Sequence, residues 1–66
     1  MKLKINGKFF ELPEGKKLCD FARESGLDPK RCVAEVNGRA LGREEFQNYV
    51  LIENDVVEIM QLVAGG

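Results

Sequence analysis

The spacing of apolar residues changes several times along the chain, and each change marks a predicted element. Polar and apolar residues alternate in 2–5, as they do in half-buried strands, and 8–12 form the predicted returning strand. Asn6-Gly7 lies between these segments and suits a type I′ turn, whose two central residues need positive φ. The pattern predicts a hairpin whose buried face carries Leu3, Ile5, Phe10 and Leu12. Phe9 would lie on the opposite face.

A short helix is predicted from Lys17. Its stripe, at positions i, i+3, i+4 and i+7, consists of Leu18, Phe21, Ala22 and Ser25. Gly26 is well placed to end this helix, because glycine readily adopts the left-handed conformation.

Strands dominate the second half of the chain. Residues 32–36 form a predicted strand, and a second Asn-Gly turn follows at 37–38. Residues 43–46 are typical of a single helical turn, 50–51 form a short apolar element, and 56–63 form the longest strand.

The order of these elements indicates an α+β fold of β-grasp (ubiquitin-like) type. In such a fold a mixed sheet has one main helix packed across one face, which leaves the other face open to solvent or a partner. We expect a β-grasp domain at 1–63 and a flexible tail at 64–66.

Length and charge narrow the classes of function. A chain of 66 residues buries only about 60% of the surface of its unfolded form, which leaves little room for an enclosed active site. Ten basic and eleven acidic residues nearly cancel, which argues against nucleic acid as a partner. Residues 1–31 hold eight basic and five acidic residues, whereas 32–66 hold two and six. The acidic half would suit a basic partner surface, or it is ordinary solvated charge.

No segment approaches the roughly 18 apolar residues of a membrane span, and none resembles a signal peptide. We therefore expect a cytoplasmic protein without a membrane partner, in which Cys19 and Cys32 are reduced. Each cysteine is expected to fill a small apolar space, with a reactive thiol as the alternative.

The chain lacks the residues that most enzymes use. It has no histidine, and so neither the usual general base near neutral pH nor a Ser-His or Cys-His nucleophile. Two cysteines without histidine cannot complete a zinc site or hold an iron–sulfur cluster. We expect no catalytic residue, no metal and no bound cofactor.

The sequence ends in Ala64-Gly65-Gly66. Because glycine has no Cβ, such an ending can pass through a narrow channel, and the acyl carbon of Gly66 is unhindered. Both properties suit an enzyme that activates a C-terminal carboxylate, although chance or truncation would give the same ending.

Several segments together resemble one family. They are Val33-Ala34-Glu35-Val36-Asn37-Gly38, Arg43-Glu44-Glu45-Phe46, residues 50–59 and Val63-Ala64-Gly65-Gly66. This combination, in a chain of this length, resembles the ThiS family, the sulfur carriers of thiamine biosynthesis.

The resemblance implies a specific chemistry at Gly66. A ThiF-like adenylyltransferase would use ATP and Mg to adenylate its carboxylate, while Ala64 and Gly65 thread into the partner. A cysteine desulfurase would be the indirect source of the sulfur that forms a thiocarboxylate, and a ThiG-like thiazole synthase would accept that sulfur. The small protein would be a co-substrate rather than an enzyme.

Docking to these partners needs a surface. Phe9, Val33, Met60 and Leu62 have the parity of the sheet face opposite the helix, and exposed apolar clusters often mark partner sites. The alternative is that loops cover them or that they are ordinary exposed residues.

Two other functions stay open at this point. One is a sulfur carrier for another pathway, such as the small subunit of molybdopterin synthase, although the short chain favours the thiamine carrier. The other is a ubiquitin-like protein modifier or interaction domain.

Overall fold

The structure is a computed structural model that describes residues 1–63. Its elements are β1 (Lys2–Ile5), β2 (Lys8–Glu11), α1 (Leu18–Glu24), the short 3₁₀ helix η1 (Pro29–Arg31), β3 (Cys32–Val36), β4 (Arg39–Ala40), α2 (Arg43–Asn48) and β5 (Val56–Gln61). The predicted tail at 64–66 lies outside the described residues.

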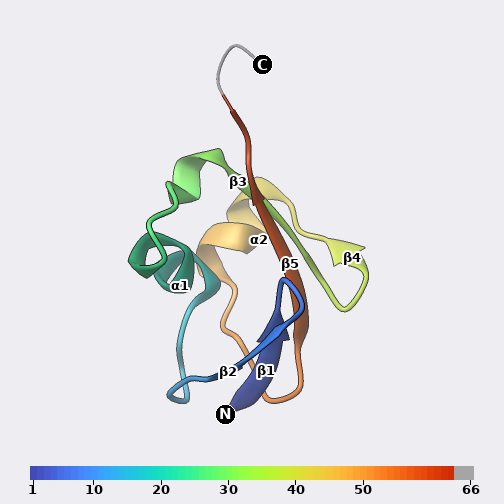
Figure 1. Ribbon diagram of the computed structural model, residues 1–66. Coiled ribbons are helices and arrows are strands. Elements are labelled where there is room, and N and C mark those ends of the chain that lie inside the picture. Colours follow the sequence, from blue (N-terminus) through green and yellow to red (C-terminus); the bar gives the residue numbers. More distant parts are fainter. Residues whose placement is uncertain (64–66) are drawn as a thin grey trace.

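Five strands form one mixed sheet in the order β2-β1-β5-β3-β4. β5 runs parallel to β1 and antiparallel to β3, and the two outer pairs are antiparallel. Figure 1 shows the long β5 running between the other strands, with α1 to one side. The expected α+β fold of β-grasp type is confirmed.

Both Asn-Gly turns form as predicted. Asn6 and Gly7 have φ of 51° and 81°, and Asn37 and Gly38 have φ of 52° and 83°. These are the positive values that a type I′ turn requires, and across the first turn Ile5 pairs with Lys8 and Leu3 with Phe10. The second turn leads into β4, which was not predicted because two residues are too few to show an alternation.

Gly26 (φ 88°) ends helix α1 as predicted. Its amide donates to the carbonyl of Arg23 (3.1 Å), and the amide of Leu27 donates to that of Ala22 (2.9 Å). This pair of bonds is the Schellman motif that closes many helices. The predicted stripe was wrong at its last position, because Ser25 is exposed and Leu27 packs against the core instead.

The last strand is shorter than the predicted 56–63. β5 ends at Gln61, which lies opposite Cys32, the first residue of β3. One more backbone bond follows, from the amide of Leu62 to the carbonyl of Arg31 (2.8 Å). The strand therefore stops where its partner strand does.

The core lies between the sheet and the two α-helices. Its buried apolar residues are Leu3, Ile5, Leu18, Ala22, Cys32, Ala34, Val36, Phe46, Leu51, Val57 and Ile59. The hairpin residues Phe10 and Leu12 are only half-buried and pack at its margin. There the ring of Phe10 meets Phe21 edge to face, with centroids 5.1 Å apart.

The two cysteines are both free thiols. Cys32 is 1% exposed, and burial raises the pKa of its thiol. It therefore fills apolar space, as predicted. Cys19 is half-buried, and its thiol donates to the carbonyl of Gln47 (3.4 Å).

One carboxylate is buried at the start of β5. Asp55 is 2% exposed and accepts hydrogen bonds from the Tyr49 hydroxyl (2.8 Å), the Ile52 amide (3.0 Å) and the Asn37 side-chain amide (3.0 Å). These bonds satisfy the carboxylate and fix the turn that leads into β5. The sequence pattern did not predict the burial of Asp55.

Two asparagine side chains extend the pairing of β5. The side chain of Asn6 accepts from the amide of Ile59 (2.8 Å) and donates to its carbonyl (3.2 Å). The side chain of Asn37 accepts from the amide of Val56 (2.9 Å). Each turn thus supplies bonds that a longer strand backbone would make, and this holds β5 in register.

We expect Asp55→Ala to destabilise the fold by about 3 kcal/mol, because buried donors lose their acceptor. Asp55→Asn keeps the shape and one acceptor oxygen, so its loss should be smaller. Urea denaturation measures the free energy of unfolding, and Glu44→Ala on exposed surface of α2 is the control, expected within about 0.5 kcal/mol of wild type. A loss for Asp55→Ala no larger than that of the control would contradict the role of this carboxylate.

Tyr49, the only tyrosine of the chain, should make the fold sensitive to alkali. Burial, and then the hydrogen bond and charge of Asp55, raise the pKa of Tyr49 from 10.0 to about 12. The folded state holds the phenolic proton more tightly than the unfolded state. This contribution to stability is therefore complete below pH 10.0 and is lost as the pH rises to about 12.

The near-ultraviolet absorbance of tyrosinate measures this pKa directly. Tyr49→Phe should lose less stability than wild type across the same pH range, because it lacks the phenol. The lysines titrate in both proteins, so their effect cancels in the comparison. A folded-state midpoint near 10.0 would show that Asp55 and burial do not act on the phenol.

Candidate functional site

The face of the sheet away from α1 carries alternate residues of the strands. On β5 these are Val56, Glu58 and Met60, and on β3 they are Val33 and Glu35. All five are exposed, whereas the residues between them are buried. This open face is where the sequence placed the docking surface.

All four residues of the predicted docking face are exposed. The exposed fractions are 72% for Phe9, 41% for Val33, 64% for Met60 and 52% for Leu62. The alternative that loops bury these side chains is therefore wrong.

The structure nevertheless divides these residues into two clusters. Phe9 lies on β2 opposite Lys4 of β1, and Lys4 lies beside Val56 of β5. The ammonium of Lys4 is 5.1 Å from the centroid of the Phe9 ring, a cation–π distance. We call Phe9 and Val56 the hairpin cluster.

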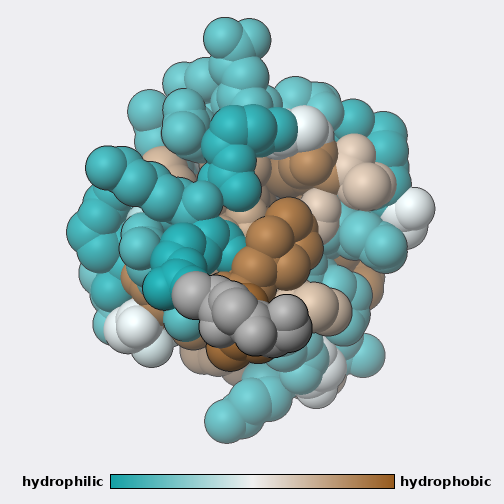
Figure 2. All heavy atoms as spheres, turned by 90° about the horizontal axis from the view of Figure 1, so that it is seen from above, coloured by the Kyte–Doolittle hydropathy of each residue, from teal (hydrophilic) through white to brown (hydrophobic). Residues whose placement is uncertain are grey.

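The terminal cluster consists of Val33, Met60 and Leu62. Val33 lies directly opposite Met60, and Leu62 follows where β5 ends. Figure 2, seen from above, shows hydrophobic surface gathered within hydrophilic surroundings at this end of the molecule. Val63 is exposed by 78% and adds apolar surface that was not predicted as part of the site.

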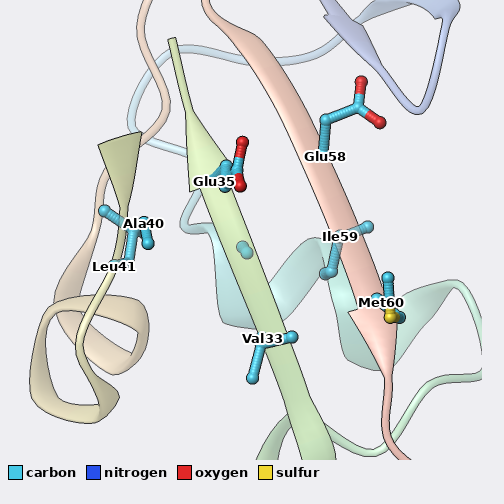
Figure 3. A pocket seen from close by; sticks show the side chains of 8 residues that line it. Val33, Glu35, Ala40, Leu41, Glu58, Ile59 and Met60 are labelled. Atoms are coloured by element: carbon cyan, nitrogen blue, oxygen red, sulfur yellow. The ribbon is translucent and has the colours of Figure 1, made fainter. Parts of the chain in front are cut away.

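A shallow depression of about 500 Å³ adjoins the terminal cluster over β3, β4 and β5. Its lining includes apolar Val33, Met60, Ala40 and Leu41 and acidic Glu35 and Glu58. Glu35 and Glu58 lie opposite each other on neighbouring strands and are the next pair after Val33 and Met60 on the same face of the sheet. Figure 3 shows Glu35 on β3 and Glu58 on β5, with Val33 and Met60 farther along the same two strands.

Neither Glu35 nor Glu58 forms an ion pair with any of residues 1–63. The two arginines in the second half of the chain are engaged elsewhere. Arg39 pairs with Glu45 (2.9 Å), and Arg43 donates to two backbone carbonyls (both 2.9 Å). The depression thus combines apolar walls with two carboxylates that lack a cation among the described residues.

Other predicted site features fall partly outside the structure. Ala64, Gly65 and Gly66 lie beyond the described residues. Within residues 1–63, no group of three or more histidine, cysteine, aspartate and glutamate side chains could hold a metal ion. No helix in this part of the chain is long and apolar enough to span a membrane.

The sequence profile of the ThiS family matches residues 3–66. The chain belongs to the ThiS family. Members of the ThiS family are small sulfur carrier proteins and not catalytic enzymes.

Two solved structures from Geobacter metallireducens are similar to this ThiS-family chain. The crystal structure of its thiamine biosynthesis protein ThiS has 26% sequence identity and a TM-score of 0.77, and the match covers 100% of both chains. The solution structure of a thiamine biosynthesis protein has 25% identity and a TM-score of 0.72, over 100% of this chain and 88% of that one. None of the curated proteins matches the sequence. Family and fold together support a sulfur carrier of thiamine biosynthesis.

Sequence reasoning missed the pairing of Glu35 with Glu58. Glu35 has the same parity as Val33, and Glu58 the same parity as Met60, so this signal could have placed both glutamates on the open face. Their register, however, depends on how β3 pairs with β5, which no local pattern specifies.

Proposed function

We propose that this ThiS-family chain carries sulfur as a thiocarboxylate on Gly66 for the formation of the thiazole of thiamine. The observation that carries the proposal is the family match, which extends through residue 66. Support comes also from the crystal structure of the Geobacter ThiS protein, which the chain matches over its full length.

The reacting group is a carboxylate, which is a poor acyl donor. In the proposed cycle a ThiF-like adenylyltransferase uses ATP and Mg, so that a Gly66 oxygen attacks the α-phosphorus and pyrophosphate leaves. The terminal sulfur of a persulfide, supplied indirectly by a cysteine desulfurase, then attacks the acyl carbon and displaces AMP. A thiol cleaves the resulting acyl disulfide, which releases the thiocarboxylate and leaves a disulfide.

The residues at the end of the chain suit this cycle. Gly65 and Gly66 have no side chain to obstruct a narrow site, and the acyl carbon of Gly66 has no Cβ beside it. Ala64 carries only a methyl group. The partner would hold the carboxylate in line with the α-phosphate and stabilise the charge that develops on the phosphate. The folded domain would provide the surface that the partner binds.

The terminal cluster is the part of the open face that we assign to docking in this cycle. Met60 precedes Gly66 by six residues, which span at most about 20 Å when extended. A partner that covers Met60 can therefore also hold the Gly66 carboxylate in its active site. Phe9 of the hairpin cluster lies on β2, which β1 separates from β5, and this cluster is not part of the assignment.

The thiocarboxylate is tested by intact mass. Incubation with a ThiF-like adenylyltransferase, ATP and a persulfide source should make the protein about 16 Da heavier, because sulfur replaces one oxygen. Deletion of Gly66 should abolish this change without altering the melting temperature, since a single residue at a chain terminus generally contributes little to packing. An unchanged mass with an enzyme that modifies another ThiS protein would refute the proposal. Transfer of the sulfur to a molybdopterin precursor, but not to thiazole synthase, would reassign the pathway.

The docking assignment is tested by two matched apolar truncations. Met60→Ala should raise the KM for the carrier in ATP–pyrophosphate exchange by about tenfold, because a buried methionine contributes roughly 1.5–3 kcal/mol to contact. Phe9→Ala, at a similarly exposed position, should leave KM within about twofold. Both variants should keep the melting temperature of wild type. Equal losses of affinity would mean that the partner covers the whole open face.

A further inference from the structure

The acidic pair in the depression is unfavourable in the isolated protein. Glu35 and Glu58 face each other directly across β3 and β5, and like charges in such cross-strand positions destabilise a sheet. No cation of residues 1–63 lies within ion-pair distance of either carboxylate. The lysine on the neighbouring strand, Lys4, is paired with Val56 and lies against the Phe9 ring instead.

The surroundings of the pair favour a ligand that is part apolar and part cationic. Val33 and Met60 lie next to the carboxylates, and Ala40 and Leu41 line the side of the depression. Apolar walls exclude water when a partner docks, and a charge pair is stronger in such a medium. A planar guanidinium is suited to this place, because its fork of donors can reach two carboxylates at once.

We infer that the depression receives a basic side chain, flanked by apolar groups, from the enzyme that adenylates Gly66. This inference rests on the proposed function and adds the chemistry of the partner's contact. Glu58 precedes Gly66 by eight residues, so the enzyme can cover the pair while its active site holds the terminus. An enzyme that binds the phosphates of ATP carries cationic groups near that site, which match the acidic half of this chain.

Other occupants fit the charges less well. A second copy of this chain in a two-fold dimer would bring four carboxylates together, because such an interface places the same patch on both sides. An anionic membrane or a nucleic acid would likewise be repelled by the pair. A basic surface on the enzyme removes the repulsion between Glu35 and Glu58 that the free carrier retains.

The test is the KM for the carrier in ATP–pyrophosphate exchange with a ThiF-like adenylyltransferase. The variants are Glu35→Gln, Glu58→Gln and their combination, with Glu44→Gln on helix α2 as the matched control. We expect the double variant to raise KM about tenfold or more and to change kcat less than twofold. The KM of wild type should rise with salt, whereas that of the double variant should depend on salt much less.

Thermal melting separates this contact from a structural role. Removal of the opposed charges should leave the melting temperature unchanged or raise it. The double variant should therefore bind the enzyme more weakly without any loss of stability. A KM of the double variant equal to that of wild type would overturn the inference. An equal rise in KM for Glu44→Gln would also overturn it, because net charge alone would then explain the effect. A loss of activity confined to sulfur transfer to thiazole synthase would overturn it as well. If wild type itself supports no exchange, the proposed function fails and this contact fails with it.

Discussion

The position of β5 in the middle of the sheet is the constraint on which the rest of the structure depends. β5 pairs with β1 on one side and with β3 on the other, so it joins the two halves of the chain. Asp55 fixes the turn before it, and the side chains of Asn6 and Asn37 bind its backbone. A slip of one residue would exchange the buried and exposed faces of β5. The register that builds the core therefore also determines which side chains lie on the open face.

A domain of this size has few apolar contacts in reserve, because it buries only about 60% of its unfolded surface. Exposed Met60 and the opposed glutamates add nothing to the packing of such a small core. Their neighbours Val57 and Ile59, by contrast, are buried in it. The two faces of β5 thus have different roles. One face packs in the core, and the other presents side chains that do not stabilise the fold. The proposed docking to a partner would account for the second face.

Local patterns predicted the elements well, and long-range pairing explains what they missed. The positive φ that Asn6-Gly7 requires and the left-handed Gly26 are properties of neighbouring residues, and both were found as predicted. The burial of Asp55 depends on donors from separate segments, and the Glu35–Glu58 pair depends on strands that are distant in sequence. For the same reason the sequence did not show that Phe9 on β2 lies two strands from Met60 on β5 and three from Val33 on β3. The parity of each residue was predictable, but its neighbour across the sheet was not.

Shifted pKa values often mark catalytic groups, yet in residues 1–63 they mark the framework. Burial and Asp55 raise the pKa of Tyr49, and burial raises that of Cys32. The pKa of Glu45 is lowered because its carboxylate accepts from the Gly42 amide at the start of α2 and pairs with Arg39. Each shift follows from a contact that holds the fold, and none belongs to the open face. This arrangement is consistent with the proposed carrier, in which the domain would present a surface and a partner would supply the chemistry at the Gly66 carboxylate.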